Sequence, residues 1–332
     1  MAQMKYFYEL TISSSPHAHS PVTTQTIMRD VLIALVPALL GSIYFFGFRA
    51  LLVTLVSAAA CVFFEWGFCK VRKLHCKTYD LSAVVTGVLL AFVCPVTIPY
   101  WTIILGDFFA IVLVKMLFGG LGKNIVNPAL AGRAFLFSWP VLMSKWVKVG
   151  FDNAAGLLST ADAVTAATPM SAMHQGALPE ESILDMFLGN IGGCIGETSA
   201  LLLIIGFIYL LYRKVITARI PLAYIGTVAI LAFLFPQGND RIAWMAAQVF
   251  GGGLMLGAIF MATDYVTSPL TKLGQIVYGI GCGIITILIR YFGGYSEGVT
   301  YAILCMNACA VLLDKIGRPV KFGAPKKEAA KK

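Results

Sequence analysis

The sequence predicts an all-α polytopic membrane protein with about ten transmembrane helices, in two inverted five-helix repeats that contain broken helices. Low charge, long apolar runs and an internal repeat predict this fold class. The chain of 332 residues is 58% hydrophobic and 12% charged, with a mean hydropathy of +0.82, whereas soluble domains carry about 25% charged residues. Its apolar runs reach about 20 residues, which is enough to cross a hydrocarbon core. They lack the alternating polarity of membrane-barrel strands, so we expect helices.

The apolar runs place the expected helices in order along the chain. They lie at 27–48, 50–69, 81–98, 100–118, 127–147, 190–212, 220–236, 242–262, 274–292 and 298–314. Because proline blocks a helix, Pro95 and Pro99 predict a break in the third run, and Pro140 predicts an early end to the fifth. The expected units are a cytoplasmic N-terminal segment at 1–26, a first repeat at 27–148, an external loop at 149–189, a second repeat at 190–314 and a basic cytoplasmic tail at 315–332.

Basic residues orient the predicted helices. Cytoplasmic loops of membrane proteins carry an excess of Lys and Arg, and most of the 25 basic residues fall on one side of the predicted topology. We therefore expect both termini in the cytoplasm and the loop at 149–189 outside. The same rule accounts for the net charge of +9, so no nucleic-acid partner is expected.

Two segments share a sequence pattern. Residues 87–99 read GVLLAFVCPVTIP and residues 257–269 read GAIFMATDYVTSP, each beginning with Gly and ending in Val-Thr-x-Pro. Each is followed, after another apolar run, by Phe-Gly-Gly. This order fits two units of five helices, and an odd number turns the second unit upside down relative to the first. Inverted repeats with broken helices place binding sites near the membrane midplane. A chance match among apolar residues is the alternative.

Two polar stretches accompany the repeat. They read GGLGKNIVNPALAG and FMATDYVTSPLT. Irregular backbone in a membrane is tolerated where it is buried in protein or lines a cavity. Asn124 and Asn127 in the first stretch offer amide groups to a polar, planar ligand, and Asp264 and Thr267 gather in the second. A tight turn and helix capping by Thr or Ser are the structural alternatives.

The longest polar gap contains STADAVTAATPMSA, with Asp162, Thr165 and Thr168. A Thr hydroxyl can accept a phosphoryl-type group when a partner enzyme supplies the metal and the activation. A loop of small residues can enter that enzyme's active site. A plain Ala/Thr-rich external linker is the alternative.

Together, the motifs GGLGKNIVNPALAG, GAIFMATDYVTSP and FGGYSEGVTYAILCMN resemble the NqrB/RnfD family, the membrane subunits of ion-pumping flavin redox complexes. The segment DAVTAATP resembles the flavin-attachment motif of that family. The motifs occur in the family's order, and the resemblance spans residues 25–315. The chain length and short N-terminal segment resemble the RnfD members more than the longer NqrB members.

The resemblance implies two flavins. Thr168 would carry FMN through a phosphoester bond that a separate flavin transferase installs from FAD, with Asp162 and Thr165 as recognition residues. Ala166 stands where the family often has Gly, a departure that leaves the acceptor hydroxyl in place.

The second implied flavin is a noncovalent riboflavin within the membrane part. Its expected region is formed by Asn124, Asn127, Asp264 and Thr267. A flavin needs several hydrogen bonds and apolar walls, which amide and carboxylate groups beside aromatic residues can supply.

Ion movement needs polar groups inside the membrane, where ionisable residues are costly and usually functional. Asp264, Asp107 and Glu197 are the candidates for an ion path. Asp107 and Lys115 share one apolar run but lie about two helical turns apart, too far for a direct pair. Glu65 lies near the end of a run, where it can snorkel or find a partner.

By resemblance, the chain is the flavin-carrying membrane subunit of an Rnf-type complex in a prokaryotic cytoplasmic (inner) membrane. That complex would transfer electrons between ferredoxin and NAD, coupled to Na⁺ or H⁺ translocation. The implied partners are other membrane and peripheral subunits, including a second covalent-FMN subunit and iron–sulfur subunits. Enzyme activity would belong to the complex, because we recognise no catalytic, nicotinamide-binding or metal-ligand pattern in this chain.

Three alternatives remain open at the level of sequence. One is a solute channel or transporter with the inverted-repeat architecture of urea channels. Another is the homologous B subunit of a Na⁺-translocating NADH:quinone oxidoreductase. A third is a structural membrane anchor, in which Thr168 would be dispensable.

Overall fold

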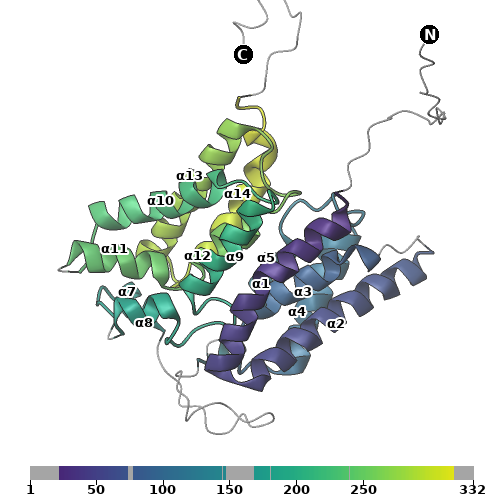
Figure 1. Ribbon diagram of the computed structural model, residues 1–332, viewed down its shortest axis with the longest axis horizontal. Helices are drawn as coiled ribbons and strands as arrows, with labels where there is room; N and C mark the ends of the chain where they lie inside the picture. The colour runs from purple at the N-terminus through teal and green to yellow at the C-terminus, as the bar shows by residue number, and fades with distance from the viewer. Residues whose placement is uncertain are drawn as a thin grey trace, which may run out of the picture.

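The computed structural model describes residues 22–73, 78–143, 145–146, 168–179, 181–238 and 240–317. Two groups of helices lie side by side, the N-terminal group on the right of Figure 1 and the C-terminal group on the left. The predicted, mostly helical fold is confirmed. Over the described ranges no strand forms, and Pro95 and Cys194 make an isolated β-bridge.

Most of the helices lie within the predicted runs, and several are shorter than expected. The first group contains α1 (Thr24–Phe46), α2 (Phe48–Val71), the 3₁₀ turn η1 (Thr78–Asp80), α3 (Ser82–Phe92), α4 (Tyr100–Phe108), the π-helix η2 (Phe109–Met116), α5 (Pro128–Leu136) and α6 (Pro140–Met143). The second group contains α7 (Pro169–His174), α8 (Ile183–Leu188), α9 (Ala200–Tyr212), α10 (Arg219–Leu234), α11 (Arg241–Phe250), α12 (Leu254–Leu256), the π-helix η4 (Gly257–Met261), α13 (Lys272–Phe292) and α14 (Val299–Leu313).

Several helices are suited to crossing a membrane. Among the described residues, three helices are long and apolar enough to span it, namely α1, α2 and α13. α11 and the following segment Leu254–Met261 form a fourth candidate span, bent by 59° at its break. The apolar helices α3, α9, α10 and α14 are shorter. These features are those of an integral membrane protein, while the count of ten spans stays a prediction.

The prolines break two of the predicted helices where expected. α3 ends at Phe92, before Pro95, so the predicted break in the third run is confirmed. The fifth run also ends early, because α5 stops at Leu136 and only the short α6 follows from Pro140.

The helix predicted at 190–212 is shorter than expected and begins at Ala200. The residues before Ala200 instead run as irregular backbone against the break after α3, where the Gly196 N–H donates to the Phe92 carbonyl at 2.8 Å. A Cβ atom on Gly196 would overlap the Phe92 ring, so only glycine permits this approach. Hydropathy alone does not reveal that these residues pair with a distant segment.

Helix α9 joins the two groups because it packs along α1 (Figure 1). The packing is close at Gly206, where an added Cβ atom would overlap the Ala34 carbonyl oxygen. Leu203 and Leu210 of α9 are buried in the same core as Ala34. The two ends of α9 adjoin the two cavities that concern function.

Candidate functional site

A cavity lies between the two helix groups at the C-terminal end of α9. Its walls come from α1, α3, η2, α9 and the loops that precede α5 and follow η4. Its volume is about 90 Å³, below the roughly 300–1,000 Å³ of typical small-molecule sites. Asn124, Asn127 and Asp264 line it together, with Phe260 as an aromatic wall. We call it the amide cavity.

The two asparagines of the amide cavity differ in their hydrogen bonding. Asn127 caps α5, since its Oδ1 accepts from the backbone N–H groups of Ala129 at 3.0 Å and Leu130 at 3.4 Å. Its Nδ2 donates to the Met261 carbonyl at 3.2 Å. The Oδ1 of Asn124, by contrast, is buried without a partner among the described residues. Asn127 therefore shapes the cavity, and Asn124 offers it an acceptor.

Asp264 and Thr267 act as a pair. The Thr267 hydroxyl donates to Asp264 Oδ2 at 3.1 Å. Thr267 is buried but does not line the amide cavity. The structure therefore places Thr267 behind Asp264, where it orients the carboxylate. The alternative of helix capping is confirmed for Thr271, the last residue of the same stretch, which caps α13.

A buried lysine separates the amide cavity from a second hollow. Lys115 Nζ donates to both carboxylate oxygens of Glu65 at 3.1 Å and to Ser82 Oγ at 2.7 Å. Lys115 and Ser82 line the amide cavity, whereas Glu65 and Asp80 line the neighbouring hollow. Glu65 thus pairs with Lys115 rather than snorkelling, and Lys115 places a positive charge beside the amide cavity.

A second cavity, lined by Thr168, Glu197 and Glu297, lies at the other end of α9, and we call it the threonine cavity. The 13 residues of α9 put the two cavities about 20 Å apart along the helix axis. Thr168 precedes α7, and its carbonyl accepts hydrogen bonds from Ser171 N at 2.9 Å and Ser171 Oγ at 2.7 Å. Within the described part of the chain, its hydroxyl makes no capping bond to α7. Asp162 and Thr165 lie outside the described residues.

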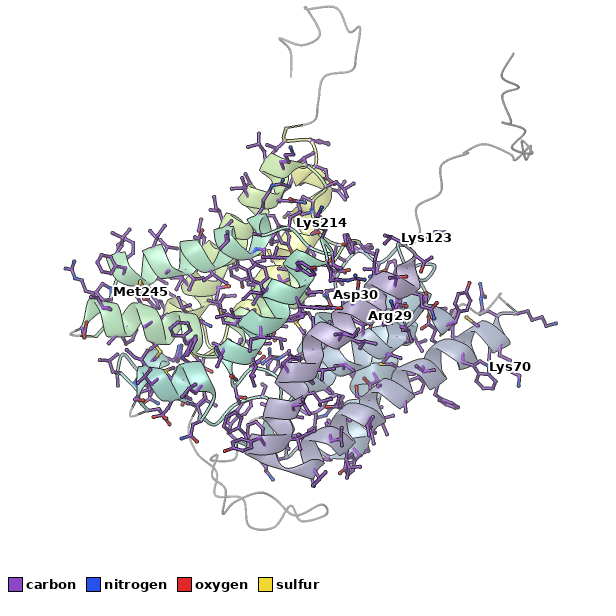
Figure 2. The ribbon with its side chains drawn as sticks, in the orientation of Figure 1. Arg29, Asp30, Lys70, Lys123, Lys214 and Met245 are labelled. Carbon is purple, nitrogen blue, oxygen red and sulfur yellow. The ribbon has the colours of Figure 1, made fainter. Side chains whose placement is uncertain are left out.

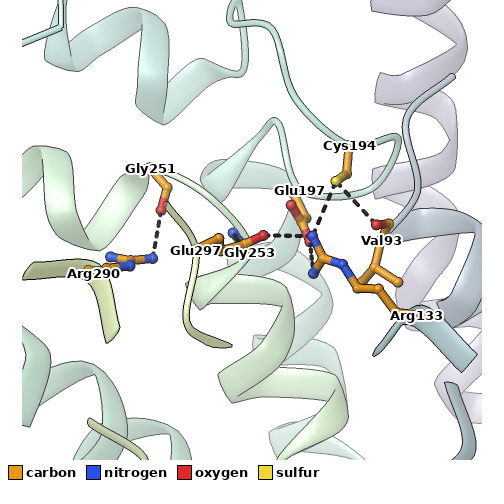
Figure 3. A network of polar contacts seen from close by, with 8 residues as sticks. All are labelled: Val93, Arg133, Cys194, Glu197, Gly251, Gly253, Arg290 and Glu297. Carbon is orange, nitrogen blue, oxygen red and sulfur yellow. Dashed lines mark hydrogen bonds and ion pairs between the residues drawn. The ribbon is translucent and has the colours of Figure 1, made fainter. Parts of the chain in front are cut away.

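A buried charge network borders this threonine cavity (Figure 3). Arg133 on α5 contacts Glu197 Oε1 through Nη1 at 3.0 Å and Glu297 Oε2 through Nη2 at 2.6 Å. Glu297 also accepts a hydrogen bond from the backbone N–H of Gly253 at the break before α12. Both glutamates line the threonine cavity with Thr168. One guanidinium thus ties the first helix group to two loops of the second.

Arg290 lies beside this network (Figure 3). Its Nη1 donates to the Gln248 carbonyl at 2.6 Å and to Gln248 Oε1 at 2.9 Å, and its Nη2 approaches the Gly251 carbonyl at 3.4 Å. Arg290 is buried, and its guanidinium binds the carbonyl groups at the break between α11 and α12.

Sequence reasoning did not single out Arg133 or Glu297. A signal was present for Arg133, because a charged residue inside a predicted apolar run is costly and usually paired. Nothing in the sequence identified its partners, since Glu197 and Glu297 are far away along the chain.

The three residues predicted for an ion path occupy different environments. Asp264 lines the amide cavity, and Glu197 is paired with Arg133 beside the threonine cavity. Asp107 is fully buried within the first helix group, where its Oδ1 lies 2.7 Å from Ser57 Oγ and 3.2 Å from Cys61 Sγ. The structure does not bring these three residues into one site.

Comparisons with known proteins show which family this chain is similar to. A family model described as the NQR2, RnfD, RnfE family matches residues 11–323. The chain is 46% identical to the D subunit of the Na(+)-translocating ferredoxin:NAD(+) oxidoreductase complex of Acetobacterium woodii, over 96% of this chain and 96% of that protein. It is 44% identical to the D subunit of the proton-translocating ferredoxin:NAD(+) oxidoreductase complex of Clostridium ljungdahlii, over 94% and 96%. The D subunit of an ion-translocating oxidoreductase complex from Actinobacillus succinogenes is 34% identical over 93% and 96%.

Proposed function

Because the chain belongs to the NQR2, RnfD, RnfE family, we propose that it is the D subunit of an Rnf-type complex in the cytoplasmic membrane of a prokaryote. The complex transfers electrons between ferredoxin and NAD⁺ and couples the transfer to Na⁺ or H⁺ translocation. The observation that carries this proposal is near full-length similarity, at 44% and 46% identity, to two relatives whose names state that activity. Oxidation of ferredoxin and reduction of NAD⁺ belong to other subunits, which include iron–sulfur proteins and a second covalent-FMN subunit.

We assign the covalent FMN to Thr168. The motif that ends at Thr168 supports this assignment, as does a hydroxyl that does not cap α7. The adjoining cavity has a volume of about 40 Å³, too small for a flavin ring system, so the tethered flavin would lie outside it. The flavin, when bound, supplies one-electron and two-electron transfer. The tether would hold it near its neighbours at high effective concentration, and a flavin transferase would attach it.

We assign the noncovalent riboflavin to the amide cavity, which would have to widen from about 90 Å³ to admit it. The buried, unpartnered Oδ1 of Asn124 fits a donor on such a ligand, and Phe260 supplies an apolar wall. Lys115 places a positive charge at the same cavity, which favours a ligand that gains negative charge on reduction. Asn127 and Thr267 position the loops and the Asp264 carboxylate that complete the walls.

The proposed membrane arrangement has about ten spans in two inverted repeats, with both termini in the cytoplasm and Thr168 outside. Lys123 and Lys214 lie near the start of α1, on the side where α14 also ends (Figure 2). Thr168 lies near the opposite end of α9. The segments with the shared sequence pattern support the repeat, since each begins in a helix and ends in the turn before the next helix.

The test is in-gel flavin fluorescence of the denatured chain after co-expression with a flavin transferase. We expect a fluorescent wild-type band and a dark Thr168→Val band. Thr198→Val is the matched control, because Thr198 lines the same cavity and its variant should stay fluorescent. A fluorescent Thr168→Val band would move the attachment to another residue. Dark bands throughout, with an active transferase, would overturn the flavin assignment and favour a solute channel.

A further inference from the structure

The carboxyl group of Asp107 is buried between α2, α3 and α4, with no cation at ion-pair distance among the described residues. Its side chain is fully buried. Oδ1 contacts Ser57 Oγ and Cys61 Sγ, while Oδ2 has no hydrogen-bond partner in the part of the chain that the structure describes. An ionised carboxylate in this position would be very costly, because both its charge and one of its oxygens would be left uncompensated.

The charged groups on the packed elements are all engaged elsewhere. The helices against α4 are α2, α3, α5 and η2, and α3 carries no charged residue. On α2, Arg49 donates to the carbonyls of Val96 and Ile98, and Lys70 lies over the Trp66 ring. The remaining ionic contacts join Lys115 of η2 to Glu65 of α2, and Arg133 of α5 to Glu197 and Glu297. Among the described residues, Asp107 therefore has no cation within ion-pair distance.

The contacts of the Ser57 hydroxyl independently indicate whether Asp107 carries a proton. Its oxygen lies 2.8 Å from the Gly87 carbonyl oxygen and 2.7 Å from Asp107 Oδ1. A serine hydroxyl has one proton to donate and two lone pairs that accept. If Asp107 were ionised, both neighbours would be acceptors, and one of the two short contacts would contain no proton. Cys61 does not resolve this, because its thiol approaches Asp107 rather than Gly87.

A proton on Asp107 satisfies every contact. Asp107 Oδ1 then donates to Ser57 Oγ, and Ser57 donates to the Gly87 carbonyl. The Cys61 thiol still donates to Oδ1, and Oδ2 becomes the carbonyl oxygen of a neutral acid, which costs less to leave unpaired than a carboxylate oxygen. Close packing fixes the arrangement, since a Cβ atom on Gly87 would lie 2.7 Å from the Ala58 Cα atom.

We propose that Asp107 is a proton-binding site, a carboxylic acid that holds its proton at neutral pH inside the first helix group. The ligand is H⁺, bound between the Asp107 carboxyl and the Ser57 hydroxyl. This inference stands apart from the flavin assignments, because it uses contacts within α2, α3 and α4 alone.

The test is infrared spectroscopy of the full chain at pH 7 in an ester-free detergent, where lipid esters do not hide the carboxylic-acid carbonyl band. Exposed aspartates are ionised at this pH and do not contribute. We expect Asp107→Asn to lose the absorbance of one protonated carboxyl group while keeping the wild-type unfolding temperature, because asparagine mimics the neutral acid. The matched control is Glu65→Gln, which should leave the band unchanged because Glu65 is ion-paired. Equal bands in wild type and Asp107→Asn would overturn the proposal.

A second measurement keeps the inference testable if Asp107→Asn does not fold. The wild-type chain is labelled with carbon-13 in the aspartate carboxyl groups, which lowers the frequency of any protonated aspartate band. Asp80→Asn and Asp264→Asn are labelled in parallel, because Asp80 and Asp264 also lack an ion pair among the described residues. A shifted band in all three proteins supports the proton at Asp107. The proposal is rejected if the wild type shows no shifted band, or if either variant loses it.

Discussion

The amide cavity and the threonine cavity lie at opposite ends of α9 and differ in how their polar groups are used. In the amide cavity, Asn124 keeps a buried oxygen that no described residue satisfies. In the threonine cavity, both carboxylates are held by Arg133. One cavity therefore has an unused hydrogen-bonding group for a ligand, and in the other the charges stabilise the protein itself.

This difference matches two ways of keeping a cofactor. A ligand held without a covalent bond must find hydrogen-bond partners in the protein, since these fix its orientation. A ligand on a tether stays at high effective concentration whatever its contacts. The charged residues beside Thr168 can therefore hold loops together, whereas a ligand in the amide cavity needs the hydrogen bond that Asn124 offers.

The largest expected effect is on stability and comes from Arg133→Met. It leaves Glu197 and Glu297 buried without their cation, and breaking a buried ion pair costs about 3–5 kcal/mol. We expect a loss of at least this size in the free energy of unfolding, measured by detergent-driven unfolding in mixed micelles. Arg213→Met is the comparison variant, because Arg213 is partly exposed while its partner Asp30 is buried and keeps a hydrogen bond from Tyr209, so we expect a smaller loss, about 1–3 kcal/mol.

A triple variant sharpens this result. Arg133→Met combined with Glu197→Gln and Glu297→Gln removes the stranded charges, so it should recover much of the lost stability. If the triple variant is no more stable than Arg133→Met, the arginine acts through packing rather than charge, and the contrast between the two cavities fails.

Lys115→Met should have the next largest effect. It strands one carboxylate, that of Glu65, which borders a hollow and keeps some access to water. We therefore expect a smaller loss, about 2–3 kcal/mol, in the same unfolding measurement. The double variant Lys115→Met with Glu65→Leu should recover part of the loss. No recovery would show that Lys115 is needed for another reason.

The sequence predicted much of the amide cavity and little of the charge network beside the threonine cavity. Asn124, Asn127 and Asp264 belong to two polar stretches in an otherwise apolar chain, and such stretches must face a cavity or another part of the protein. Arg133 and its two glutamates meet only through tertiary packing, because Glu197 lies in the loop before α9 and Glu297 in the loop before α14. Local sequence patterns do not show which residues far apart along the chain come into contact. For the same reason, hydropathy predicts helix for the irregular backbone before Ala200.

Asn127→Ala tests whether this residue is structural. It removes the cap of α5 and leaves the Met261 carbonyl without its donor, so we expect a loss of about 1–3 kcal/mol in unfolding free energy. Asn127→Ser keeps an oxygen for the cap but cannot reach Met261, and its loss should be smaller. Equal losses would show that the cap contributes nothing measurable.

Asn124→Leu should have the smallest effect on stability and still weaken binding. Its Oδ1 has no partner among the described residues, so replacing the amide with an apolar side chain of similar size removes no bond from the described protein. If the amide cavity holds the noncovalent flavin, that ligand loses one hydrogen bond, and its dissociation constant should rise by about tenfold.

The measurement is a titration with riboflavin, followed by fluorescence quenching, of purified chain from which noncovalent flavin has been removed. Thr86→Val, which alters another polar residue lining the same cavity, is the control for general damage. An unchanged affinity in Asn124→Leu would show that Asn124 does not bind the ligand. The two cavities would then no longer differ in that one recognises its ligand by hydrogen bonds and the other holds it by a covalent tether.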